Sequence, residues 1–142
     1  MAIVVSYNGS ILVNGTDLSD HATSIRVNDG QETREATTMG NTARVFRAGI
    51  QTPSIEATFR NDHAASSVES TLRGLISITS TGFTVIAKKN NSGTTTVNPS
   101  YTLTAILDGD LMVLNDEHGE IAEISARFVP YSGSLTVSTT AT

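Results

Sequence analysis

The stretch Asn61–Ile78, NDHAASSVESTLRGLISI, contains the clearest helical pattern in the chain. Four of its apolar residues recur at helical spacing, so they form one apolar stripe about three turns long. Ser66 and Glu69 have the spacing of a capping box, in which each side chain satisfies a free backbone N–H group. We predict a helix at about residues 66–76 whose stripe packs on another element. The residues of the stripe are Val68, Leu72, Leu75 and Ile76.

Most of the remaining chain alternates between apolar and polar residues, which is the pattern of half-buried β-strands. Ile55–Arg60 and Ile121–Val129 are two examples, and Asn14-Gly15 is typical of a tight turn between strands. We therefore predict a mainly β fold, an antiparallel β-sandwich or barrel with one flanking α-helix. A chain of 142 residues fits one domain over residues 1–142, and we expect a flexible C-terminal arm from about residue 131.

Residues 29–50, DGQETREATTMGNTARVFRAGI, form the least regular part of the sequence. They are rich in Thr and Gly, show little periodicity and are much longer than an ordinary connection between strands. A loop of this length is either functional or disordered. Val45, Phe46 and Ile50 are unusual in a purely solvated loop, so we favour a functional role for a long loop at about residues 29–50.

The composition argues against several classes of function. Ser and Thr together number 37 while aromatic residues make up 5%, which suits a thin β core better than a deep enzyme pocket. The formal net charge of −5 argues against a dedicated nucleic-acid grip, because phosphate binding depends on Lys and Arg. The start, MAIVVSYNG, lacks the basic flank of a signal peptide, and no apolar run is long enough to span a membrane.

No residue pattern in the sequence predicts catalysis or a cofactor. His21, His63 and His118 each lie in turn-rich stretches, and the chain has no Cys. The best metal candidate, Asp116–Glu120, lacks the periodicity of a calcium loop and is better explained as a solvated turn. We therefore expect no enzyme activity, no cofactor and no metal.

Five stretches carry a resemblance to a known family through their order and spacing: VNGTDLSDH (13–21), SI (24–25), TMGNTAR (38–44), ASSVESTL (65–72) and NPSYT (98–102). Each alone is mostly turn residues. Together they resemble the tail tube proteins (major tail proteins) of long, non-contractile-tailed bacteriophages, over about Ile11 to Val129.

This resemblance implies a structural virion protein, made in the bacterial host cytoplasm, that self-assembles into hexameric rings. The rings stack into a tail tube through which DNA passes without specific binding, and the implied partners are further copies and the tape-measure, tail-terminator and tail-tip proteins. The resemblance also implies that the long loop bridges subunits or rings. The residues expected to do so are Arg34, Thr38, Met39, Arg44, Phe46 and Arg47.

The bore of such a tube would need a polar lining. Between Leu103 and Ala126 the chain has six carboxylates and no Lys or Arg, and acids facing a bore would repel DNA phosphates. Possible bore-lining residues are Asp108, Asp110 and Glu123. Two alternatives remain: a ring protein of a related tube, such as a secretion-system or gene-transfer particle, and a carbohydrate-binding β-sandwich module. The module would need an aromatic platform, which the three scattered tyrosines do not supply.

Overall fold

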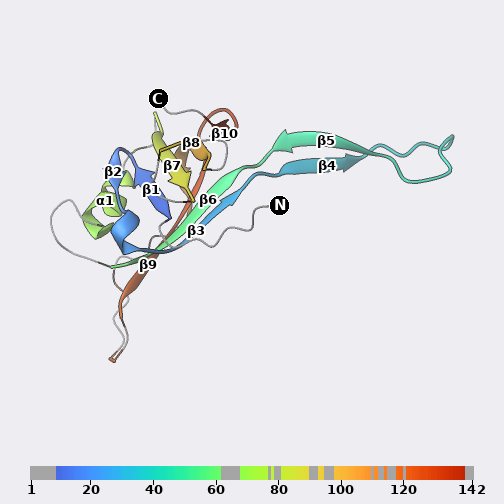
Figure 1. Ribbon diagram of the computed structural model, residues 1–142. Coiled ribbons are helices and arrows are strands. Elements are labelled where there is room, and N and C mark those ends of the chain that lie inside the picture. Colours follow the sequence, from blue (N-terminus) through green and yellow to red (C-terminus); the bar gives the residue numbers. More distant parts are fainter. Residues whose placement is uncertain are drawn as a thin grey trace.

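The protein is built around one curved antiparallel sheet, with a long β-hairpin projecting from it and an α-helix beside it (Figure 1). This computed structural model describes residues 9–61, 68–76, 78, 81–89, 93–94, 98–109, 111, 114, 118–119 and 121–139. The sheet strands are β1 (Ser10–Val13), β2 (Thr16–Asp17), β3 (Ala22–Asn28), β6 (Ser54–Arg60), β7 (Phe83–Lys88), β8 (Ser100–Leu107), β9 (Glu123–Pro130) and β10 (Thr136–Ser138). The projecting hairpin is β4 (Gln31–Glu35) and β5 (Phe46–Gln51), the helix is α1 (Val68–Leu75), and a 3-10 turn covers Ser19–His21.

The sheet folds over on itself to give the two layers of a sandwich. Its strand order is β2-β1-β7-β8-β9-β6-β3, and β8 and β9 pair only over Ala105–Leu107 and Phe128–Pro130. The apolar members of each alternating strand meet between the layers, where the rings of Phe83 and Phe128 pack edge to face with their centroids 5.7 Å apart. The predicted fold class, a mainly β antiparallel sandwich with a flanking helix, is confirmed.

The turn at Asn14-Gly15 joins β1 to β2 as the sequence predicts. Both residues have positive φ, 51° and 82°, which is the backbone of a two-residue turn whose twist matches its strands. Leu18, directly after β2, is buried, so this corner of the chain closes one end of the core.

The helix is confirmed, with one correction to its apolar stripe. Val68, Leu72 and Leu75 are buried in the core, but Ile76 is 53% exposed, so the prediction that it completes the stripe was wrong. The helix ends at Leu75, and the turn that follows points Ile76 outward while Ile78 packs against the core. The proposed capping partner, Ser66, lies outside the described residues.

Glu69, the second residue of the proposed capping box, is largely buried. It is only 8% exposed, and its carboxylate pairs with Arg73 one turn later at 3.2 Å. This i,i+4 pair stabilises the helix along its length, and a capping role for Glu69 stays a prediction.

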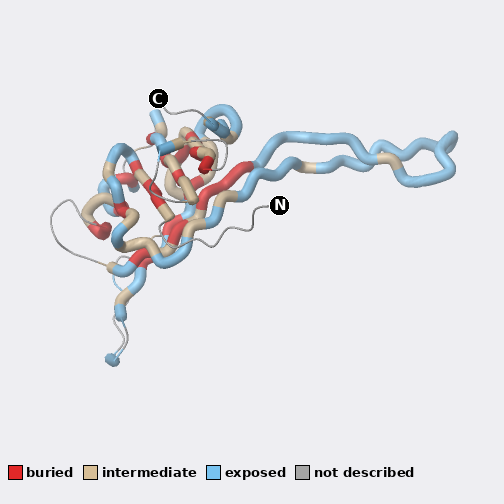
Figure 2. The backbone as a smooth tube through the Cα atoms, in the orientation of Figure 1, coloured by how far each residue is buried: buried red, intermediate tan, exposed pale blue. Residues whose placement is uncertain are grey.

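The segment predicted as a long loop is mostly a β-hairpin, which is a second correction. The ladder between β3 and β6 ends at Asn28 and Ser54, continues through the hydrogen bond from Thr52 N–H to Gly30 O (2.8 Å), and resumes as β4 and β5. Within residues 29–50, only residues 29–30 and the tip, 36–45, lie outside the strands. Figure 2 shows the hairpin exposed along its length, and without a buried face it has no apolar alternation for sequence analysis to detect.

The expected C-terminal arm contains a short strand. β10 pairs with Ser100–Thr102 of β8, on the edge of β8 that β9 occupies further along. Five residues, 131–135, separate β9 from β10, and the pairing register against β8 shifts by three residues between the two strands. This part of the chain is therefore attached to the sheet, and flexibility of the segment from about 131 stays a prediction.

Candidate assembly surfaces: the long hairpin and a polar sheet face

The long hairpin (residues 31–51) exposes apolar side chains away from the core. Met39 is fully exposed, Ile50 is 73% exposed and Phe46 is 54% exposed. Scattered apolar residues are normal on a surface, but here three large ones share a narrow element that has no core of its own. Such an element gains stability by contacting another surface.

The charges of the hairpin are only partly compensated. Arg34 and Arg47 are direct cross-strand neighbours, an arrangement of like charges that destabilises a hairpin. Arg34 pairs with Glu32 at 2.7 Å, and Arg44 approaches Glu35 at 3.8 Å. Within the described part of the chain, the Arg47 guanidinium contacts only the carbonyl of Phe46, at 3.4 Å. The hairpin therefore offers a cation without a carboxylate partner.

The tip of the hairpin is held by its own polar groups. The amide and hydroxyl of Thr38 both donate to Asn41 Oδ1, at 2.7 and 3.0 Å, and the Asn41 N–H returns to the Thr38 carbonyl at 3.0 Å. The Val45 N–H donates to Thr37 Oγ1 at 2.9 Å. These bonds define the turn that presents Met39 to solvent.

All six residues predicted to act in assembly lie on this hairpin. The structure therefore brings them together on one projecting element, and their role in assembly stays a prediction. They are Arg34, Thr38, Met39, Arg44, Phe46 and Arg47.

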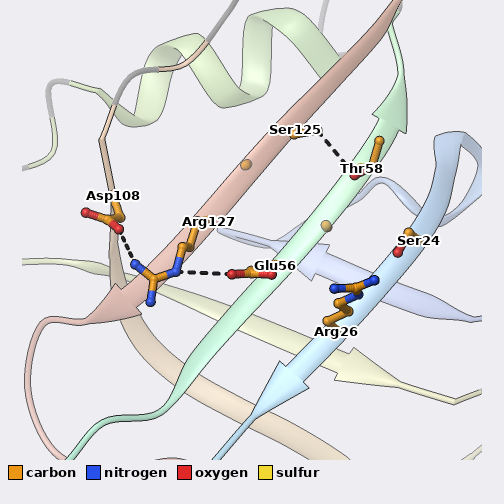
Figure 3. Close-up of a pocket in the computed structure, with 9 residues that line it drawn as sticks. Ser24, Arg26, Glu56, Thr58, Asp108, Ser125 and Arg127 are labelled. Atoms are coloured by element: carbon orange, nitrogen blue, oxygen red, sulfur yellow. Dashed lines mark hydrogen bonds and ion pairs between the residues drawn. The ribbon is translucent and has the colours of Figure 1, made fainter.

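A second surface is the polar face, the side of β3, β6 and β9 that points away from the core. Figure 3 shows its side chains on the opposite side of the sheet from α1. The register aligns Glu56 with Arg127 and Arg60 with Glu123, so each carboxylate faces an arginine on the neighbouring strand. The members of the face are Ser24, Arg26, Glu56, Thr58, Arg60, Asp108, Glu123, Ser125 and Arg127.

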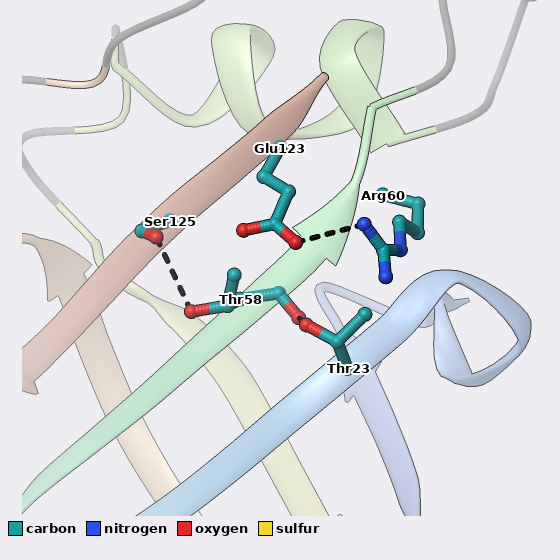
Figure 4. Close-up of polar contacts among 5 residues, drawn as sticks. All are labelled: Thr23, Thr58, Arg60, Glu123 and Ser125. Carbon is teal, nitrogen blue, oxygen red and sulfur yellow. Dashed lines mark hydrogen bonds and ion pairs between the residues drawn. The ribbon is translucent and has the colours of Figure 1, made fainter. Parts of the chain in front are cut away.

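The contacts across the polar face neutralise its charges. Arg127 lies between two carboxylates: its Nε is 3.2 Å from Glu56 Oε1, and its terminal nitrogen pairs with Asp108 (Figure 3). Arg60 pairs with Glu123 at 2.9 Å (Figure 4). With Arg26, the face has three arginines and three carboxylates, so its formal charge is zero.

Hydroxyl groups fill the space between the ion pairs. Thr58 Oγ1 and Ser125 Oγ lie 3.2 Å apart, and Thr23 Oγ1 donates to the Thr58 carbonyl at 3.2 Å (Figure 4). A shallow depression of about 420 Å³ runs over this surface. Arg26 lines it and has no ion-pair partner among the described residues, so one guanidinium remains available to an outside group.

Two of the three possible bore-lining acids, Asp108 and Glu123, lie on the polar face, and Asp110 is outside the described residues. Sequence analysis missed that both are paired with arginines. The missing information was strand register: β6 against β9 brings Arg60 to Glu123, 63 positions away, and β8 against β9 brings Asp108 to Arg127, 19 positions away. A role in lining a bore stays a prediction for all three.

The described residues contain neither a metal-ligand cluster nor a membrane-spanning helix. No group of three potential metal ligands occurs among the described residues, and most of the Asp116–Glu120 candidate lies outside them. In the described ranges, no helix has the length and apolar character needed to cross a membrane.

Comparison with known proteins finds structures of similar fold but no match in sequence. No protein-family model matches the chain, and no curated protein matches it in sequence. Several solved structures are similar, and three of them cover 84–98% of this chain.

The first is a chain of the virion of a native gene transfer agent particle (TM-score 0.69, 12% identity, 93% of this chain and 96% of that one). The second is a chain of the tail of an empty gene transfer agent particle (0.64, 14%, 84% and 83%). The third is a chain of the tube-terminating cap of the anti-feeding prophage (0.63, 13%, 98% and 96%). The chain therefore shares its fold with chains of phage-tail-related particles.

Proposed function

We propose that this chain is a structural subunit of a phage-type tail tube, that its copies form hexameric rings, and that the rings stack into a conduit for DNA. The shared fold supports a structural role in a tail. One similar chain belongs to a tail described with C6 symmetry, and another to a six-fold symmetrised baseplate of the anti-feeding prophage. Six-fold assembly is the simplest extension of those descriptions to this chain.

The observation that carries the proposal is the long hairpin itself. It extends the β3–β6 ladder beyond the sandwich and exposes Met39, Phe46 and Ile50. In a free subunit these side chains stabilise nothing, whereas in an assembly they bury apolar area worth about 25 cal/mol per Å². A subunit that must hold neighbours in a tube has a use for such an element.

An open sheet edge supports the same proposal. Among the described strands, β3 lies at one end of the sheet order and pairs only with β6. Within the described residues no strand pairs with its outer edge, and an uncovered edge is a liability in a monomer. In a ring, a head-to-tail contact between neighbours covers such edges and closes on itself.

The polar face has the character needed to line a conduit. Two of its three arginines are paired with carboxylates within the subunit and its formal charge is zero, so Arg26 alone gives only a weak grip to a passing polyanion. The remaining partners of the proposed tube are the tape-measure, tail-terminator and tail-tip proteins. We place the protein in the virion tail after synthesis in the bacterial host cytoplasm.

The runner-up is a ring protein of a related particle, because the similar chains come from gene transfer agents and an anti-feeding prophage. In this alternative the protein forms the same kind of ring, and only the particle that contains the ring differs. It predicts the same assembly in isolation, so the two are separated by identifying DNA inside particles purified from cells.

The test is assembly of the purified chain. We expect negative-stain microscopy at high concentration to show rings with six-fold symmetry or tubes, and mass photometry to show hexamers. A variant lacking residues 37–43 keeps strands β4 and β5 and loses only the tip of the hairpin. We expect this variant to form rings that do not stack, so it separates ring formation from stacking. A full-length chain that stays monomeric at every concentration contradicts the proposal.

A further inference from the structure

Four charged side chains of the polar face lie in one line across neighbouring strands (Figure 3). Arg26 of β3 is the direct cross-strand neighbour of Glu56 on β6, and Glu56 is the direct neighbour of Arg127 on β9. Asp108, directly after β8, continues the line because its N–H bonds to the Arg127 carbonyl at 2.8 Å. We call these four residues the charged row. Their signs alternate, from an arginine at one end to an aspartate at the other.

The two ends of the charged row differ from its middle. Glu56 and Asp108 both pair with Arg127, so the inner charges meet opposite charges within the subunit. Arg26 has no ion-pair partner among the described residues, and its strand pairs only with β6 there. At the other end Asp108 is exposed, and the part of the chain that the structure describes offers no hydrogen bond to its Oδ1. The row therefore ends in an unpaired cation and in a carboxylate that can accept a second partner.

A second set of charges on the polar face is complete and gives a contrast. Arg60 pairs with Glu123 at 2.9 Å across β6 and β9, and the register gives Arg60 no paired residue on β3. Between the two sets, the aligned residues Ser24, Thr58 and Ser125 carry only hydroxyl groups. Of the described charges on this face, those of the charged row are the ones that leave a partner to be supplied from outside the subunit.

We propose that Arg26 of one copy pairs with Asp108 of the next copy around the ring, so that the charged rows join into one closed girdle. This inference rests on the proposed ring and names the residues that align its neighbours. A row with a cation at one end and a carboxylate at the other is complementary to a second copy placed head to tail, the kind of contact that closes into a ring. Paired charges across an interface mainly give specificity, because a shifted neighbour would bring like charges together. The girdle also leaves no arginine of the polar face free to hold a passing phosphate.

Complementation between two charge-reversed variants tests this pairing. Arg26→Glu places a carboxylate opposite Asp108 of the neighbour, and Asp108→Arg places a guanidinium opposite the neighbour's cation. We expect each variant alone to need at least roughly 5-fold more protein than the wild type to form rings, the upper range for a partly exposed ion pair. An equal mixture should restore ring formation, because each reversed charge then meets the other. Native mass spectrometry should show hexamers that contain both variants in equal number.

Arg60 provides the matched control. Arg60→Gln removes an arginine of the same face whose partner is internal, so the concentration needed for rings should stay unchanged, whereas Arg26→Gln should raise it. Asp108→Arg also loses its contact with Arg127, so a variant with all four charges of the row reversed provides a second test that keeps every internal pair. This reversed-row variant should form rings alone and exclude wild-type subunits from them. Circular dichroism checks that each variant folds.

Each arm has an outcome that overturns the inference while wild-type rings leave the proposed function intact. For folded variants, these outcomes are a mixture of Arg26→Glu and Asp108→Arg that assembles no better than either alone, and mixed hexamers of the reversed-row variant with the wild type. Equal effects of Arg26→Gln and Arg60→Gln also overturn it, and this comparison decides if the charge reversals prevent folding. Wild-type protein that forms no rings contradicts the proposed function, and this inference falls with it.

Discussion

Replacing Leu72 by Ala tests how the helix holds the sandwich together. Leu72 is completely buried in the core cluster, between Val68 and Leu75 on the inner side of α1. The substitution removes three carbon groups, worth about 2.4 kcal/mol of transfer free energy at ~0.8 kcal/mol each. A residual cavity adds to this, so we expect the free energy of unfolding to fall by about 3 kcal/mol, within the usual 2–5 kcal/mol.

The matched control is Ile76→Ala. Ile76 lies one residue beyond the helix and is 53% exposed, so its truncation should cost less than about 1 kcal/mol. Urea denaturation followed by circular dichroism gives both values, provided the slopes of the transitions agree. At roughly 4 °C per kcal/mol for a chain of this size, the melting temperatures should differ by about 10 °C.

Protein concentration must be kept low, because assembly would stabilise the folded subunit by mass action. Equal losses for Leu72→Ala and Ile76→Ala would refute the placement of the helix. A larger loss at Ile76 would restore the four-residue stripe that the sequence predicts.

Three further predictions concern charge and the long hairpin. Glu69→Lys should destabilise the fold by more than about 1 kcal/mol because it places a second cation beside Arg73, whereas Glu69→Gln should cost less; equal urea midpoints would contradict this. Deleting residues 37–43 should leave the melting temperature nearly unchanged, since the tip is exposed, while it abolishes stacking seen by microscopy. Combining Glu56→Gln with Asp108→Asn should free Arg127 and make the protein retain DNA at low salt, and adding Arg127→Gln should reverse the effect; no retention by the first variant would contradict the charge balance.

The fold was predictable where each strand has one buried and one solvated face. β6 and β9 alternate strictly, with Ile55, Ala57 and Phe59 inside, and the sequence shows this directly. The tight turn at Asn14-Gly15 was also predictable, because few residue pairs tolerate positive φ at both positions.

The long hairpin escaped prediction because nothing in it is buried. Its alternation is interrupted by an irregular register between Gln31 and Thr33, and Arg34 lies opposite Arg47. These strands form because the backbone hydrogen bonds between β3 and β6 continue into β4 and β5. The residue types alone do not reveal that pairing. Ile76 was misplaced for a different reason: helical spacing fits it, but the helix ends before it.

Of the two candidate surfaces, the hairpin residues were predicted from sequence, whereas the ion pairs of the polar face were not. The six hairpin residues were predicted from the family resemblance and from the length, arginine content and apolar residues of the segment, and their role in assembly stays a prediction. The balance of the polar face needed strand register, because Glu56 and Arg127, or Arg60 and Glu123, meet only when β6 pairs with β9. Distant carboxylates and arginines look like separate charges until that pairing is known.

This pairing changes the argument for passage through the proposed tube. An acid-rich lining would act on DNA by repulsion, but the polar face pairs Asp108 and Glu123 with arginines and has no formal net charge. Compensated pairs have fields that fall off within a few ångströms, and salt screens what remains beyond about 8 Å. A bore lined by this face would therefore leave DNA unbound through neutrality and hydration, and not through repulsion by unpaired acids.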